Sequence, residues 1–192
     1  MTDNKNIDNY KKMEKKFDEI SFWDLINEAK AKSKNQDKQI QHLIKLLGKS
    51  SEDNIISFQN IFQKLYTSSY TSDLWAAAYI INGGCSDDGF DYFRGWLIAQ
   101  GKDSYYKTLE NPEYLANIIK EEQFGEVECE DIISAAGAAY EKKTGKDYEY
   151  FLNIGSDENY SYPEIKLDWN EEGDDLRNKY PKLWNKFMAR EI

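Results

Sequence analysis

The residues best suited to chemistry in this sequence are two carboxylates and a guanidinium group that recur at helical spacing. Asp87, Asp91 and Arg94 are four and three positions apart, which places them on one stripe of a helix, with Asp88 beside them in its first turn. Such a set could bind a ligand or a metal ion, or supply a general acid. It could equally be a structural ion network, in which the aspartates interact with the helix dipole and Arg94 neutralises Asp91. Both interpretations are open at this point.

A cysteine next to this stripe raises the question of nucleophilic catalysis. Cys85 immediately precedes the same predicted helix, a position at which a thiol can be activated. A nucleophilic thiol also needs a base, and the only histidine, His42, is expected on the polar side of another helix as a solvated surface residue. The sequence has no Ser-His-Asp set, phosphate-binding glycine loop or H-E-x-x-H motif, and its two cysteines form no C-x-x-C pair. We expect reduced thiols, no metal and no cofactor.

A second set of candidate residues combines aromatic rings with acidic charge near the C-terminus. Residues 147–175 contain ten Asp and Glu residues and a single lysine. Tyrosine and tryptophan combine apolar area with a polar tip, which suits them to anchoring a partner. The candidate binding residues are Tyr148, Tyr150, Asp157, Glu158, Tyr160, Tyr162 and Trp169. The segment either docks a basic protein or wraps around the domain as irregular chain.

The charge of the whole chain narrows the class of partner. The formal net charge is −10, and residues 1–50 contribute +3, from 11 lysines and 8 acidic residues, so the remainder contributes −13. A protein surface that binds nucleic acid needs clustered cations, whereas this chain is acidic. We therefore do not expect a nucleic-acid partner, and we expect a basic protein instead. No run approaches the roughly 20 apolar residues of a membrane helix, and the first residues lack the apolar run of a signal peptide. We expect a cytoplasmic protein without membrane contact.

The stretch from Leu74 to Gly101 must position the Asp/Arg stripe. Residues 74–81 are apolar on every side, which is typical of a wholly buried helix. Gly83 and Gly84 allow a tight turn, and Ser86 is a suitable N-cap for a second helix over residues 87–100. We expect the large rings of this hairpin to be buried, namely Trp75, Phe90, Phe93 and Trp96. A small-residue face at Gly95 and Ala99 invites close approach by the alanines of a later helix, Ala135, Ala136, Ala138 and Ala139.

The other elements complete an all-α prediction with one domain, a helical bundle around a buried helical hairpin. Residues 1–20 form a lysine-rich arm, and residues 21–192 form the domain. Ser21 is expected to cap a first helix that ends near Lys34, and further helices are expected over residues 36–47, 51–66, 102–109, 112–120, 129–144 and 181–187. Residues 147–175 show no clear period, so we predict an irregular acidic C-terminal wrap.

Three central motifs carry a resemblance to a known family. They are WAAAY at residues 75–79, GGCSDDGF at residues 83–90 and FRGWLIAQG at residues 93–101. This pattern resembles the bacterial family known as domain of unknown function 4240. The likeness begins at Phe22 and Trp23, is strongest over residues 70–101, and extends to the PKLW motif at residues 181–184. That family has no established activity, so the resemblance implies a fold and no chemistry.

Two functional hypotheses follow from these observations. The first is a protein-interaction or regulatory module that binds, and could neutralise, a basic partner. The alternative is a hydrolytic or metal-assisted enzyme that uses the Asp/Arg stripe. They differ in whether Asp91 and Arg94 line an open cleft or lie sealed beneath neighbouring helices.

Overall fold

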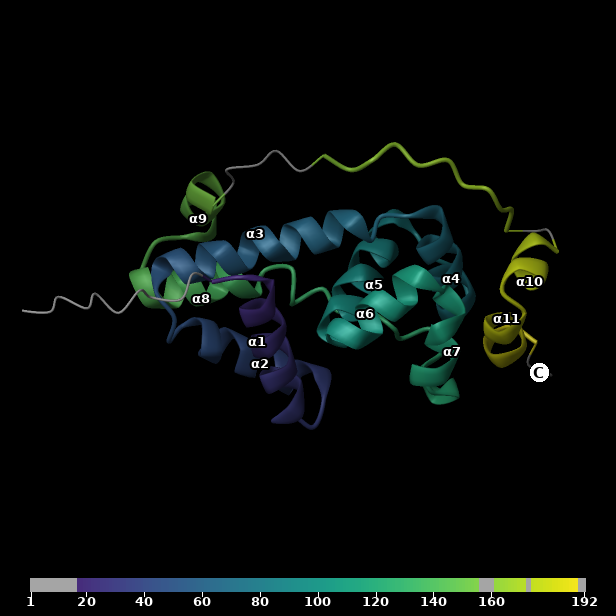
Figure 1. Cartoon of the computed structure of the whole chain (residues 1–192), viewed down its shortest axis with the longest axis horizontal. Coiled ribbons are helices and arrows are strands. Elements are labelled where there is room, and N and C mark those ends of the chain that lie inside the picture. Colours follow the sequence, from purple (N-terminus) through teal and green to yellow (C-terminus); the bar gives the residue numbers. More distant parts are fainter. Residues whose placement is uncertain (1–16, 156–160, 172–173, 190–192) are drawn as a thin grey trace, which may run out of the picture.

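The structure, a computed structural model, describes residues 17–155, 161–171 and 174–189. Within these residues the chain is all-helical, which confirms the predicted fold class (Figure 1). In chain order the elements are α1 (Glu19–Ala31), α2 (Gln36–Leu47), α3 (Glu52–Ser68), α4 (Ser72–Asn82), α5 (Asp87–Ala99), α6 (Lys102–Glu110), η1 (Pro112–Tyr114), α7 (Leu115–Ile118), η2 (Glu121–Gln123), α8 (Ala135–Thr144), α9 (Tyr148–Gly155), α10 (Asp175–Lys179) and α11 (Pro181–Phe187). The bundle is elongated, with α1, α2, α8 and α9 toward one end and α4, α7, α10 and α11 toward the other (Figure 1). No helix in the described part combines the length and apolar character needed to cross a bilayer.

The predicted central hairpin is formed by α4 and α5. The Thr71 hydroxyl caps α4 by accepting a hydrogen bond from the Leu74 amide at 3.2 Å, and Gly83 ends the helix with a φ of 68°. The Ser86 hydroxyl then caps α5 by accepting from the Gly89 amide at 3.1 Å. Both helices therefore begin at side-chain caps, and the turn between them uses the positive φ that glycine tolerates.

The large rings of this hairpin are buried with one exception. Phe90, Phe93 and Trp96 are buried as predicted, whereas Trp75 is only partly buried and its predicted burial is wrong to that extent. The Trp75 ring stacks on Phe90 with centroids 4.7 Å apart, and its indole N–H donates to the Cys85 carbonyl at 3.1 Å. The polar edge of Trp75 therefore closes the turn between α4 and α5 instead of entering the core.

The small-residue face of α5 has a different partner from the predicted one. A Cβ atom added to Gly95 would lie 2.6 Å from the Cys129 carbonyl oxygen and 3.0 Å from Ile132 Cγ2. The Cys129 amide also donates to the Tyr92 carbonyl of α5 at 2.9 Å. The chain that precedes α8 therefore fills the place expected for Ala135, Ala136, Ala138 and Ala139.

Helix α8 is shorter than predicted. The helix expected over residues 129–144 begins at Ala135, and the chain before it packs against α5, where the Cys129 amide donates to the Tyr92 carbonyl. The alanine-rich α8 packs instead against α2, α3 and α9.

Residues 147–175 are partly helical, which corrects the prediction of an irregular segment. The Asp147 carboxylate accepts from the Tyr150 amide at 2.8 Å at the start of α9. The Tyr148 ring occupies the space above Gly137 of α8, where a Cβ atom would lie 2.1 Å from the ring. Tertiary packing on that glycine therefore positions α9, which the sequence pattern did not reveal.

The N-terminal boundary also differs from the prediction. Asp18, not Ser21, caps α1 by accepting from the Ser21 amide at 2.9 Å, and α1 ends at Ala31 instead of near Lys34. Phe17 contacts Phe58 of α3 at a centroid distance of 6.4 Å. Residues 17–20 thus belong to the folded domain, and the rest of the predicted arm, residues 1–16, lies outside the described residues.

Residues 161–171 run along one long side of the molecule without regular secondary structure (Figure 1). This segment, which we call the strap, leads to α10 at the opposite end from α9. The following α11 packs on α4 and α7 through the buried residues Leu183 and Phe187. The described part of the predicted C-terminal wrap is therefore a helix, an extended strap and a helical end.

Candidate functional site

Arg94 of α5 is fully buried among aromatic rings. Its guanidinium carbon lies 3.9 Å from the ring centroid of Tyr66, 5.0 Å from Tyr70, 5.1 Å from Phe90 and 4.9 Å from Tyr162. A cation that approaches ring faces this closely is attracted by their quadrupoles, most strongly where water is excluded. The rings come from α3, the loop after it, α5 and the strap, so Arg94 joins four parts of the fold.

Hydrogen bonds fix the same guanidinium in place. Nη1 donates to the Tyr66 carbonyl at 2.6 Å, and Nη2 donates to Asp91 Oδ1 and, at 3.3 Å, to the Tyr162 hydroxyl. The Tyr66 hydroxyl in turn donates to the Asp91 carbonyl at 3.0 Å. Arg94 Nε is buried and has no hydrogen-bond partner among the described residues. A fully enclosed guanidinium of this kind cannot touch a substrate without rearrangement of Tyr162.

The four residues of the predicted stripe lie in different environments. Asp91 forms the ion pair with Arg94, and its side chain keeps 38% of its surface exposed. Asp87 and Asp88 are exposed in the first turn of α5, where the helix dipole favours negative charge. Among the described residues, no group of three or more His, Cys, Asp or Glu side chains is placed to hold a metal ion. The geometry thus favours the structural interpretation of the stripe over the catalytic one.

Neither cysteine has the environment of a nucleophile. Burial, with a smaller contribution from Asp87, raises the pKa of the Cys85 thiol to about 12, and burial raises that of Cys129 to about 12. The position of Cys85 before a helix therefore does not activate it, because desolvation outweighs the dipole. His42 is partly buried and its Nε2 atom is enclosed, so the prediction of a fully solvated histidine is wrong.

Three residues of the second set, Tyr148, Tyr150 and Tyr162, are exposed on α9 and on the strap. Large apolar side chains with exposed surfaces number seven in the described part of the chain, and five of them lie between residues 148 and 167. Those five are Tyr148, Tyr150, Leu152, Tyr162 and Leu167. We call α9 and the strap together, with these side chains and their carboxylates, the acidic aromatic surface.

Carboxylates are interleaved with these apolar side chains. Within residues 147–155 and 161–171, the exposed acidic residues are Asp147, Glu149, Glu164, Asp168 and Glu171, and Lys166 is the one cation. Asp168 is committed to the fold, because it accepts hydrogen bonds from Lys179 at 2.6 Å and from Ser72 at 2.7 Å, and the Lys179 bond lowers its pKa. Asp147 caps α9 through the Tyr150 amide, and the carboxylates of Glu149, Glu164 and Glu171 form no ion pair with the described residues.

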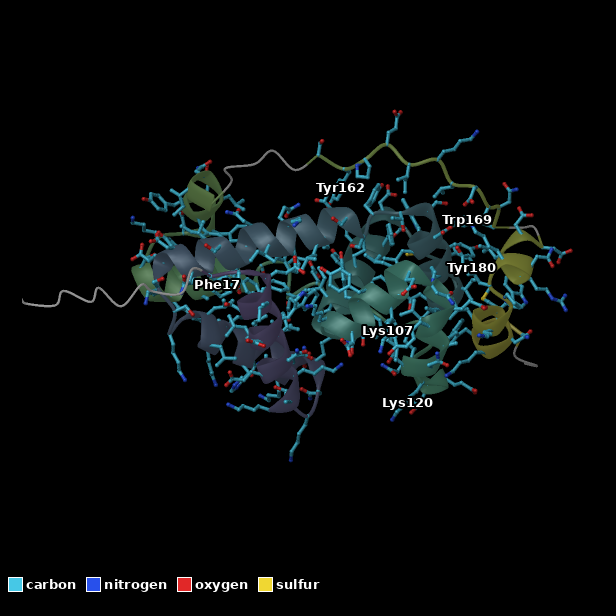
Figure 2. The ribbon with its side chains drawn as sticks, in the orientation of Figure 1. Phe17, Lys107, Lys120, Tyr162, Trp169 and Tyr180 are labelled. Carbon is cyan, nitrogen blue, oxygen red and sulfur yellow. The ribbon has the colours of Figure 1, made fainter. Side chains whose placement is uncertain are left out.

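The strap is attached to the domain at two points. Near its start, Tyr162 lies over Tyr70 with ring centroids 4.7 Å apart and contacts Arg94, while about half of its side chain stays exposed. Near its end, Trp169 is buried against Tyr79, and its indole N–H donates to the Ser72 carbonyl at 3.1 Å. Both rings face the helices in Figure 2. The residues between them are held away from the core with their side chains largely exposed.

The outcome for the predicted binding residues is therefore mixed. Tyr148, Tyr150 and Tyr162 lie on the acidic aromatic surface, and buried Trp169 serves as an anchor of the strap. Asp157, Glu158 and Tyr160 lie outside the described residues. Leu152 and Leu167, which are both exposed, were missed. Leu152 follows Tyr148 by four residues, so the helical period of α9 places both on the same side of the helix.

Comparison with known proteins gives one match. The model of a family described as "Protein of unknown function (DUF4240)" matches residues 17–142, which is well over half of the chain. No curated protein and no solved structure matches the chain. The matched region holds α1 to α7 and most of α8, and it ends before α9 and the strap.

Proposed function

The chain belongs to the DUF4240 family, and we propose that it is a protein-interaction module whose acidic aromatic surface binds a basic partner. The observation that carries this proposal is the concentration of five of the seven exposed large apolar side chains on a segment that also carries most of its charge as carboxylates. Exposed apolar side chains that are rimmed by charged residues are a feature of sites of association. The carboxylates around these side chains favour a partner with a positively charged surface.

The composition of this surface matches that of a protein-binding site. Tyrosine is enriched at the centre of interfaces because it contributes area and a hydrogen bond with few rotatable bonds. The rings of Tyr150 and Tyr162 already contact cations within the chain, Lys146 at 4.1 Å and Arg94 at 4.9 Å. Their exposed faces suit the lysine and arginine side chains of a basic partner in the same way.

The strap suits a recognition element because of how it is held. Its two anchors fix the ends, and no backbone hydrogen bond to another segment is formed by residues 161–167 in the described structure. A partner can therefore contact both the side chains and the main chain of this stretch. Because its ends are already fixed, the strap loses less conformational entropy when a partner binds.

The enzymatic alternative has weaker support. Its four candidate residues do not converge on a common point, and Arg94 is enclosed by rings. We also propose a cytoplasmic location, which is consistent with two free thiols and no disulfide among the described residues.

The proposal can be tested by capture of partners on immobilised protein from an extract of the source organism. We would compare the wild type with Leu152→Ser/Leu167→Ser, which removes two exposed apolar contacts of the acidic aromatic surface. The control is Ile20→Ser, since Ile20 is the most exposed large apolar residue of the described part and lies on α1. We expect wild type and control to retain the same basic protein, and the double variant to retain at least about tenfold less. Equal retention by all three, or retention of acidic proteins alone, would contradict the proposal.

A further inference from the structure

A pocket of about 430 Å³ lies at the corner between α1 and α2, away from the acidic aromatic surface. Four lysines, one histidine and the N-cap residue of α2 account for most of its lining, namely Lys32, Lys34, Lys38, Lys45, His42 and Asn35. No Asp or Glu residue is part of this lining. On a chain with a formal net charge of −10, such a local excess of cations sets the pocket apart from the rest of the surface.

The charges around the pocket are only partly neutralised within the fold. Lys32 pairs with Glu28 at 2.6 Å, and this hydrogen bond is the main reason that the pKa of Glu28 is lowered, with smaller effects from His42 and Lys49. Lys38 donates to the amide oxygen of Gln41 at 3.1 Å, which leaves its charge uncompensated. Lys34 and Lys45 are exposed and form no ion pair with the described residues. Three positive charges are therefore available to a ligand.

The start of α2 adds to this positive potential. Asn35 lines the pocket and caps the helix, with its side chain accepting from the Lys38 amide at 3.0 Å. The N-terminus of this helix of 12 residues carries a partial positive charge, which Asp37 in its first turn offsets in part, so the lysines supply most of the attraction for an anion. Lysine side chains and a helix N-terminus together are the groups with which proteins hold phosphate.

We infer that this pocket binds the phosphate group of a small phosphorylated molecule. The volume lies in the range of small-molecule sites, which is about 300 to 1,000 Å³. A polyanion is a poorer fit, because Glu28, which pairs with Lys32, and Asp37, in the first turn of α2, would repel a chain that extends beyond the pocket. This site is independent of the proposed function, since it shares no residue with the acidic aromatic surface.

The test uses the fact that His42 is the only histidine of the chain, so its imidazole C–H signals in a proton NMR spectrum need no assignment. Wild-type protein would be titrated with inorganic pyrophosphate, and separately with sodium chloride to the same ionic strength. We expect pyrophosphate to shift the His42 signals along a saturable curve and chloride to shift them weakly and without saturation. Equal, unsaturated shifts with both salts would overturn the inference and show general screening only.

Two matched variants complete the experiment. Lys34→Gln/Lys45→Gln removes two unpaired charges of the pocket, and Lys142→Gln/Lys143→Gln removes two exposed lysines at the end of α8. We expect the first to weaken pyrophosphate binding at least tenfold and the second to leave it within twofold of the wild type. Equal weakening by both variants would mean that net charge alone drives binding. That result would overturn the inference that pyrophosphate binds in this pocket. Tighter binding of a single-stranded oligonucleotide than of pyrophosphate would overturn the assignment to a small molecule.

Discussion

The guanidinium group of Arg94 lies over the ring of Tyr66, with 3.9 Å between its central carbon and the ring centroid, and it donates to the carbonyl of the same residue at 2.6 Å. One residue of α3 therefore contacts the arginine through both its ring and its main chain. This relationship joins α3 to α5 and, through Tyr162, joins both to the strap.

Replacing this arginine should destabilise the fold even when the charge is kept. Arg94→Lys retains one positive charge but loses the planar fork that reaches Tyr66 and Asp91 together. Because Asp91 is partly solvated, we expect a loss in the free energy of unfolding toward the lower end of the roughly 3 to 5 kcal/mol seen for broken buried pairs. Urea unfolding followed by circular dichroism measures this loss. An unchanged midpoint would show that the aromatic cluster does not depend on the guanidinium.

Two glycines of α5 should respond in opposite directions to the same substitution. A Cβ atom on Gly95 would meet the Cys129 carbonyl at 2.6 Å, so Gly95→Ala should destabilise by about 1 to 3 kcal/mol through overpacking. A Cβ atom on Gly89 would have ordinary contacts, the nearest at 3.4 Å, so Gly89→Ala should stabilise by about 0.5 to 1 kcal/mol through higher helix propensity. Thermal unfolding of both variants gives the two changes in melting temperature. If both changes have the same sign, the chain before α8 does not pack on Gly95 as described.

A carboxylate at the start of α1 should make part of the stability depend on pH. Glu19 accepts a hydrogen bond from the Tyr106 hydroxyl, which lowers its pKa below the ordinary value of 4.5. A group with a lowered folded-state pKa stabilises the fold above its unfolded pKa and loses that contribution as the pH falls through the folded value. Glu19→Gln should therefore lower the melting temperature at pH 7, and this effect should shrink as the pH falls below 4.5. Tyr106→Phe removes the same bond from its other end and should reproduce this pattern, whereas a pH-independent effect of either variant would contradict it.

The thiols should be unreactive in the folded protein. With a pKa raised from 9.0 to about 12, Cys85 carries roughly a thousandfold less thiolate at pH 8 than an ordinary cysteine. In a Cys129→Ser background, alkylation of Cys85 by iodoacetamide should be slower than in urea by about that factor. Rapid alkylation in the native state would show an activated thiol and revive the nucleophile hypothesis.

The sequence predicts the central hairpin well because its signals are local. An apolar run, two glycines at the turn and a serine cap each act within a few residues, and α4 and α5 begin and end accordingly. The same holds for most of the other helices. Such elements need no knowledge of the remainder of the chain.

Where the prediction is wrong, a distant contact decides the structure. Helix α9 packs on Gly137, which has no side chain to exclude the Tyr148 ring, and the chain before α8 packs on Gly95 of α5, where the Cys129 amide bonds to the Tyr92 carbonyl. The aromatic rings that surround Arg94 include Tyr66 and Tyr162, which are 96 positions apart in the chain. No periodicity encodes such an arrangement, so the difference between a catalytic and a structural arginine could not be read from spacing.

The central claim, that the acidic aromatic surface binds a basic partner, makes its clearest prediction about association rates. Opposite charges attract over a distance set by the Debye length, which is about 8 Å at physiological ionic strength, so they accelerate encounter. The test variant neutralises four exposed carboxylates on or next to this surface with little change in shape, Glu149→Gln, Glu164→Gln, Glu171→Gln and Asp174→Asn. The control variant neutralises four exposed carboxylates between α6 and α8, Glu110→Gln, Glu122→Gln, Glu126→Gln and Glu128→Gln.

Both variants change the net charge by the same amount, so a difference between them reports on location alone. The association rate constant for the captured basic partner would be measured by stopped-flow fluorescence at low and at physiological salt. We predict that the test variant associates at least about tenfold more slowly than the wild type at low salt and loses most of the salt dependence, while the control keeps both. Identical rates for the two variants, or a wild-type rate that does not fall with added salt, would contradict the claim.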